Sequence, residues 1–142
     1  MIILVHHVES MWSDAMKRLG VCVEDYCDEL RKFLKRNKSA QVILTRFEDG
    51  RLEDFHFEYG LAEFIKTVKE YSYGWEAGML PEDESAPGGN HSEVVWIPDW
   101  IKALSGKTVH LCGMFDGECI EDITIALQYV HCKVVRVEKL IA

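Results

Sequence analysis

Three mainly apolar runs dominate the hydropathy pattern of the chain. They cover residues 2–5, 41–47 and 107–113, and each is rich in branched side chains. Strands that are buried on both faces of a parallel sheet show this pattern, because helices cover both faces. We therefore predict that these three segments are parallel neighbours in the middle of one sheet.

Helical periodicity appears between these runs. Val23, Cys27, Leu30 and Leu34 recur at the spacing of one helix face, while charged side chains occupy the opposite face. The same reasoning predicts helices over 12–19, 61–71, 99–104 and 119–130, and strands over 71–75, 93–97 and 133–137. The segment 51–57 is either a hairpin or an irregular connection.

The C-terminal part of the chain has the clearest pattern. The last apolar run, the helix over 119–130 and the strand over 133–137 form a β-α-β unit, which calls for a right-handed crossover between parallel strands. The whole pattern predicts one α/β domain over residues 1–142. We expect three layers, with a mostly parallel sheet of five or six strands and helices on both faces.

Residues 76–90 are rich in glycine, proline and acidic side chains. Large apolar residues are almost absent after Leu80. Long connections of this composition are typical of surface loops, many of which act as lids. We predict an exposed loop that lies over or beside the carboxyl ends of the strands.

Composition and charge narrow the class of protein. Apolar residues make up 48% of the chain and charged residues 28%, which is the balance of a globular protein. The net charge of −8 argues against a face that follows nucleic-acid phosphates. No apolar run approaches the ~20 residues of a membrane helix, and the first residues lack the features of a signal peptide. We expect a cytoplasmic protein that binds neither nucleic acid nor membrane.

The chain has five cysteines, an odd number with no C-x-x-C spacing. This argues against a disulfide framework in a chain of this length. We expect most of them to be small buried apolar residues.

Candidate chemistry gathers where the strands should end. Ligands of open parallel sheets bind beyond the carboxyl ends of the strands, and this rule selects His6, His7 and the loop 113–119. Cys119 should begin a helix, where free N–H groups and the helix dipole lower the pKa of a thiol. The resulting thiolate could attack a substrate, with a histidine as base and backbone amides holding an oxyanion. The alternative is that Cys119 only packs under its helix.

The stretch from Thr108 to Leu127 resembles the nucleophile segment of the isochorismatase-like cysteine hydrolases, whose fold the nicotinamidases share. In that family an apolar strand leads to a glycine, five further residues and a cysteine at the start of a helix. Gly113 and Cys119 have this spacing, Ile120 stands in for a valine, and Ala126 lies near an expected small position. The resemblance implies a cysteine nucleophile and a small amide or ester substrate.

Two positions depart from the pattern of that family. The family has an aspartate at the end of its first strand, where this chain has His6 or His7. It also uses a lysine before a later helix, and residues 90–95 contain none. We therefore take Cys119 as the candidate nucleophile, with His6 and His7 as its candidate catalytic partners. The substrate-binding candidates are Gly113, Asp116, Gly117 and His91.

The six histidines do not form a metal motif. None pairs with another at i, i+4 on a helix, and H-E-x-x-H is absent. His6 and His7 should point to opposite faces, because successive side chains alternate along a strand. We expect neither a metal ion nor a cofactor.

Aromatic residues gather in two segments, 71–75 and 96–100. Such residues more often form a core or an oligomer interface than a stacking site for a ligand. We therefore expect a homo-oligomer. The candidate site at the ends of the strands further predicts that the protein binds a small molecule. Besides a hydrolase, two functions stay open: a non-catalytic member of the fold that binds a small molecule or a protein, and an assembly protein.

Overall fold

The computed structural model describes residues 1–8, 19–46, 69–72 and 97–142. Several predicted features fall largely or wholly outside these residues. They are the helix over 12–19, the connection over 51–57, most of the helix over 61–71, the loop 76–90 with His91, and the strand over 93–97.

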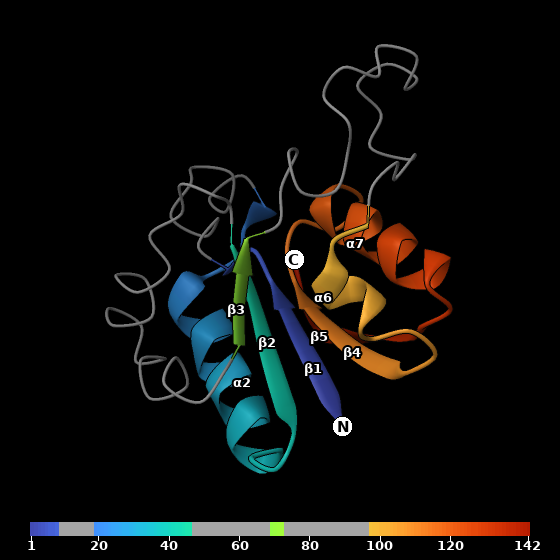
Figure 1. Cartoon of the computed structure of the whole chain (residues 1–142). Helices are drawn as coiled ribbons and strands as arrows, with labels where there is room; N and C mark the ends of the chain where they lie inside the picture. Colours follow the sequence, from blue (N-terminus) through green and yellow to red (C-terminus); the bar gives the residue numbers. More distant parts are fainter. Residues whose placement is uncertain (9–18, 47–68, 73–96) are drawn as a thin grey trace.

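The five strands in the described part of the chain form one sheet (Figure 1). Their order is β3-β2-β1-β4-β5, and every neighbouring pair is parallel. The three apolar runs are the neighbours β2, β1 and β4, as predicted. The strands are β1 (Ile2–His6), β2 (Gln41–Arg46), β3 (Lys69–Ser72), β4 (Thr108–Gly113) and β5 (Lys133–Ile141).

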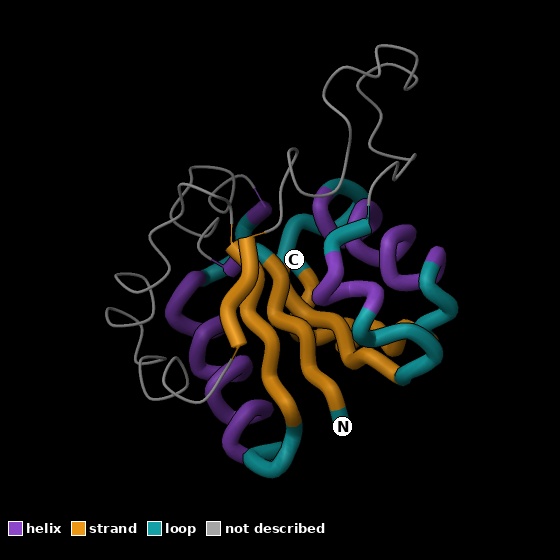
Figure 2. The backbone as a smooth tube through the Cα atoms, in the orientation of Figure 1, coloured by secondary structure: helices purple, strands orange, loops and turns teal. Residues whose placement is uncertain are grey.

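Helices lie against both faces of the central strands (Figures 1 and 2). Ile3 and Val5 of β1 belong to one buried cluster with helix α2 (Val23–Arg36). Leu4, which points the opposite way, belongs to a second cluster with α6 (Asp99–Lys102) and α7 (Cys119–Tyr129). The alternation of β1 side chains between two cores confirms the α/β class with a parallel sheet.

Helix α2 buries the face that its sequence predicts. Cys27, Leu30 and Leu34 are buried, and Tyr26 joins them. Burial of each leucine contributes about 1.5–3 kcal/mol to folding. Acidic side chains in the first turn and basic ones in the last turn match the helix dipole.

Two elements differ from the predicted bounds. We predicted that a helix runs to about Tyr71, but residues 69–72 form β3, because they pair with residues 43–46 of β2. We predicted a last strand over 133–137, and β5 continues to Ile141. Its register against β4 shifts between Leu111 and Gly113. Hydropathy does not reveal this extension, because Glu138 and Lys139 interrupt the apolar pattern.

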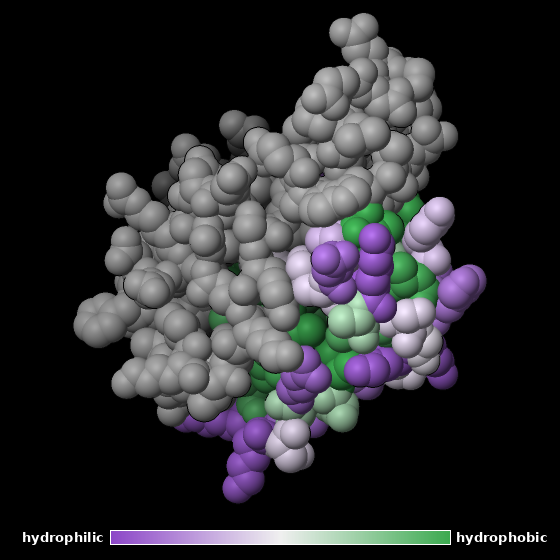
Figure 3. All heavy atoms as spheres, in the orientation of Figure 1, coloured by the Kyte–Doolittle hydropathy of each residue, from purple (hydrophilic) through white to green (hydrophobic). Residues whose placement is uncertain are grey.

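The described surface mixes hydrophilic and hydrophobic side chains on the face that Figure 3 shows. Among the described residues, the large hydrophobic side chains that lie exposed are Met1, Leu19 and Tyr129. A search of the same residues finds no helix whose length and apolar character would let it cross a membrane.

Candidate functional site

Two buried histidines stand at the carboxyl end of β1. The side chains of His6 and His7 are almost completely buried. A hydrogen bond of 2.6 Å joins Nδ1 of His6 to Oγ1 of Thr45, the residue beside it in β2. The two imidazole rings stack with their centroids 3.8 Å apart.

The stacking corrects the prediction that these two side chains point to opposite faces. β1 ends at His6, and His7 has a φ of 54°, in the left-handed region. The alternation of a strand therefore no longer applies to His7. Both rings end up on the same side of the chain.

The environment of His6 favours its neutral form. Burial lowers the pKa of His6 well below its ordinary value, and the neighbouring His7 lowers it further. A hydrogen bond with the backbone of Cys119 acts in the opposite direction and raises the pKa. This contact brings the end of β1 together with the start of α7, as the sequence predicts for these residues.

Cys119 is the first residue of α7, and its side chain is half-buried. Burial raises the pKa of its thiol to about 11, and the carboxylates of Asp122 and Glu118 act in the same direction. Hydrogen bonds from the backbone of Phe115 and of Cys119 itself lower the pKa, but by less. The prediction of a lowered pKa is therefore wrong, because desolvation and two nearby acids outweigh the helix N-terminus.

These two shifts together define the chemical state of the site at neutral pH. The imidazole of His6 is neutral and the thiol of Cys119 keeps its proton. A thiolate would form only as its proton moves to a base. The contact of His6 is with the backbone of Cys119, and its Nδ1 is bonded to Thr45.

Gly113 of β4 pairs with His6 of β1. Its φ is 123°, and a Cβ atom placed there would lie 2.0 Å from the carbonyl oxygen of His6. The N–H of Met114 donates to the same oxygen over 3.0 Å. No side chain fits at Gly113, so the loop can begin immediately beside His6 only because this residue is glycine.

The loop between Gly113 and Cys119 is attached at several points. The carbonyl oxygen of Phe115 accepts hydrogen bonds from the N–H groups of Glu118 and Ile120, each over 3.1 Å, at the start of α7. The Met114–Phe115 peptide bond is cis. Gly117 has a φ of 75°, which permits the turn before the helix.

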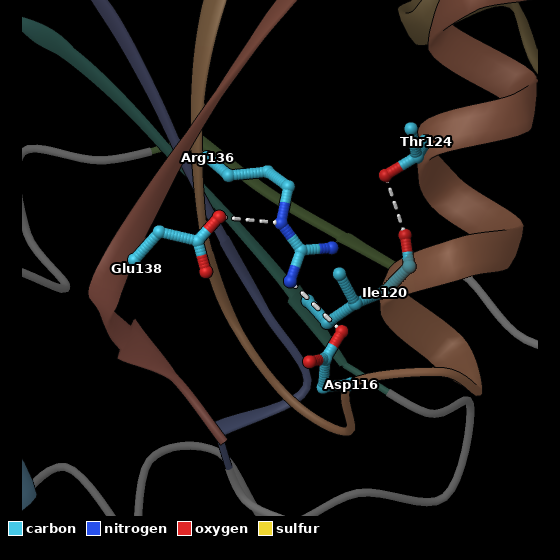
Figure 4. Close-up of polar contacts among 5 residues, drawn as sticks. All are labelled: Asp116, Ile120, Thr124, Arg136 and Glu138. Carbon is cyan, nitrogen blue, oxygen red and sulfur yellow. Dashed lines mark hydrogen bonds and ion pairs between the residues drawn. The ribbon is translucent and has the colours of Figure 1, made fainter.

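Asp116 is attached to the end of β5. Its carboxylate accepts a hydrogen bond of 2.9 Å from Nη2 of Arg136, and this ion pair lowers the pKa of Asp116 (Figure 4). Its N–H donates to the carbonyl oxygen of Ala142 over 2.7 Å. The substrate-binding candidate Asp116 thus already has a cationic partner.

Tyr26, Thr45 and Arg136 contact the site, and the sequence analysis did not select them. The hydroxyl of Tyr26 donates to the carbonyl oxygen of Leu140 over 2.7 Å, which ties α2 to the end of β5. Thr45 could have been found, because it is a polar residue near the end of an apolar run. Tyr26 and Arg136 gave no such signal, because their partners are far away in the sequence.

The structure therefore brings His6, His7, Gly113 and Cys119 together at the carboxyl ends of the strands, with Asp116 and Gly117 in the same loop. His91 lies outside the described residues. Within the described parts of the chain, no group of three or more metal-ligating side chains lies close enough to hold an ion.

The thiols follow the expectation for most cysteines. Cys27, Cys112 and Cys132 are buried, while Cys22 is exposed, and all five cysteines are free thiols.

The chain was compared with protein-family models, with curated proteins and with solved structures. None of these three comparisons finds a match.

Proposed function

We propose that this protein is a cysteine-dependent hydrolase of a small amide or ester, with an isochorismatase-like α/β fold. One observation carries the proposal: the buried imidazole of His6 contacts the backbone of Cys119, the first residue of α7. Acyl transfer through a thiol requires a cysteine nucleophile and an adjacent base that accepts its proton.

The proposed reaction begins with two neutral groups. Sγ of Cys119 attacks the carbonyl carbon of the substrate, and its proton passes to His6 as the S–C bond forms. The backbone N–H groups of Phe115 and Cys119, which contact the thiol, would stabilise the oxyanion. His6 then gives its proton to the departing amine or alcohol.

Water completes the proposed cycle. It adds to the thioester as His6 takes one of its protons. When the C–S bond breaks, His6 returns that proton to the sulfur, which releases a carboxylic acid and restores the free thiol and the neutral imidazole. His7 stacks on His6 and would hold the orientation of its ring. Thr45 would hold the same ring through Nδ1.

The proposal extends to the whole chain. We propose a single three-layer domain with five or six strands, acting in the cytoplasm as a homo-oligomer on a small molecule. Gly113, Asp116, Gly117 and His91 would border the substrate. The helices on both faces of the described sheet support the layered arrangement.

Trapping of an acyl-enzyme tests the proposed hydrolase. We expect p-nitrophenyl acetate to acetylate Cys119, detected by peptide mass spectrometry, and to be hydrolysed with turnover. Cys119→Ser should abolish both, and His6→Asn should slow acylation by about 10²-fold or more, the contribution of a general base. Cys22→Ser is the matched control, because it removes an exposed thiol that is distant from Cys119 in the sequence, and it should leave turnover unchanged.

A non-catalytic binding protein is the second candidate. The raised pKa of Cys119 and the absence of the aspartate and lysine of the resembled family both favour it. In that case, acetylation of Cys119 would be no faster than that of the other cysteines, and no turnover would be seen with esters or small primary amides.

A further inference from the structure

The far end of β5 bends back to the loop that precedes Cys119. Its register against β4 shifts between Leu111 and Gly113, so that Ile141 pairs with Gly113. The N–H of Ala142 donates to the carbonyl oxygen of Gly113 over 3.1 Å, and the carbonyl oxygen of Ala142 accepts from Asp116. The irregular strand therefore runs alongside the loop.

Arg136 connects the same strand to the loop through its side chain. It lies on β5, and its guanidinium binds two carboxylates at equal distances of 2.9 Å (Figure 4). Nη2 contacts Asp116 of the loop, and Nε contacts Glu138 of β5 itself. Only the first of these contacts joins the strand to another segment.

Asp116 directly follows Phe115, whose backbone organises the start of α7. The Phe115 carbonyl oxygen accepts two N–H groups of the first turn, and the Phe115 backbone also hydrogen-bonds the thiol of Cys119. A displacement of Asp116 would therefore move both contacts. The path from Arg136 to the thiol consists of the ion pair with Asp116, the backbone from Asp116 to Phe115, and the hydrogen bond between Phe115 and the thiol.

We propose that Arg136 is a positioning residue, whose ion pair with Asp116 fixes the loop that sets the backbone of Phe115 against Cys119. The importance of this role for catalysis rests on the proposed hydrolase. The positioning of the loop does not rest on the proposed hydrolase, because the rate at which the Cys119 thiol is alkylated measures it without any catalysis.

The two carboxylates on Arg136 give a matched pair of variants. Asp116→Asn and Glu138→Gln each remove one negative charge from the same guanidinium, and both acids are largely exposed. Only Asp116→Asn weakens a side-chain contact between the strand and the loop, and it leaves the backbone hydrogen bonds with Ala142 in place. Loss of an acid near a thiol would by itself lower the thiol pKa, whereas loss of the Phe115 contact raises it. The sign of the effect thus separates positioning from a simple change of charge.

The experiment measures alkylation of Cys119 by iodoacetamide between pH 7.5 and 9.5, in a Cys22→Ser background. We expect Asp116→Asn to slow alkylation by roughly tenfold, the loss of thiolate that accompanies a rise of one pKa unit. Glu138→Gln should change the rate less than twofold. Hydrogen exchange of the 113–119 loop should be faster in Asp116→Asn only.

Three results would overturn the proposal. These are equal effects of the two variants, faster alkylation in Asp116→Asn, and unchanged exchange of the loop. A failure of the proposed hydrolase looks different. Neither the native chain nor any variant would then hydrolyse an ester, while Asp116→Asn would still slow the alkylation of Cys119.

Discussion

The hydroxyl of Thr45 and the imidazole of His6 form a fully buried polar pair. A buried hydrogen-bonding group that loses its partner costs about 1–3 kcal/mol. The bond therefore both stabilises the end of the sheet and fixes the ring that contacts Cys119.

Thr45→Val should lower the free energy of unfolding by about 1–3 kcal/mol, because it leaves Nδ1 of His6 without this hydroxyl. Urea denaturation measures the loss. Thr124→Val is the control, since that hydroxyl donates to the Ile120 carbonyl within α7 (Figure 4) and lies partly exposed. A loss no larger than that of the control would contradict the role of Thr45.

Thiol reactivity should follow exposure. Cys22 is exposed, Cys119 is half-buried with its pKa raised to about 11, and burial raises the pKa of Cys112 to about 12. We expect iodoacetamide to alkylate Cys22 first, Cys119 more slowly, and Cys112 only on unfolding. Peptide mass spectrometry over time gives the order. Alkylation of Cys119 ahead of Cys22 would show that the thiol has a lower pKa than its surroundings in the structure imply.

At the scale of elements, the site depends on the contact between β1 and β4. The backbone of β4 approaches His6 so closely that Gly113 cannot carry a side chain. The carboxyl ends of the two strands thereby hold His6 beside the loop that leads to Cys119.

Gly113→Ala should destabilise the fold by more than the same change at Gly106. Both residues have a positive φ, but a Cβ at Gly106 would meet nothing within 4 Å. The difference therefore measures the clash with the His6 carbonyl together with the more strained φ of 123° at Gly113, and forced overpacking alone costs about 1–3 kcal/mol. Thermal and urea unfolding of the two variants measure this difference. Equal losses would mean that β1 and β4 can separate freely at this point.

The elements themselves were partly predictable. The apolar runs identified the three central strands, and helical spacing identified α2 and α7, because both patterns record burial along the chain. Strands over 71–75 and 133–137 were predicted, but the start of β3 at Lys69 and the extension of β5 to Ile141 were not, because these ends depend on pairing with β2 and β4 rather than on hydropathy.

At the scale of the whole molecule, burial of His6 makes stability depend on pH. Its pKa in the folded state is lowered, while an unfolded histidine has a pKa of about 6.5. Below that value the unfolded chain binds more protons than the folded chain, so the stability present above pH 6.5 is lost as the pH falls.

We expect the free energy of unfolding to fall between pH 6.5 and 5 by at most about 1.4 kcal/mol per pH unit from this group. His6→Asn should remove most of that slope. His131→Asn is the control, because His131 is exposed and its φ of 64° suits asparagine. Urea denaturation as a function of pH measures the slopes. If the free energy of unfolding of His6→Asn still falls with pH at the same slope, other groups cause the pH dependence.

The sequence by itself determined the α/β class, the three central strands and the placement of His6, His7 and Cys119 at strand ends and a helix start. Those features depend on local patterns of burial and on the rule that parallel strands end at the same edge. Only the tertiary structure decided the chemical state of the site. The stacked histidines, the raised pKa of Cys119 and the tie from Arg136 to Asp116 arise from contacts between distant segments, and desolvation there is set by what packs around each group.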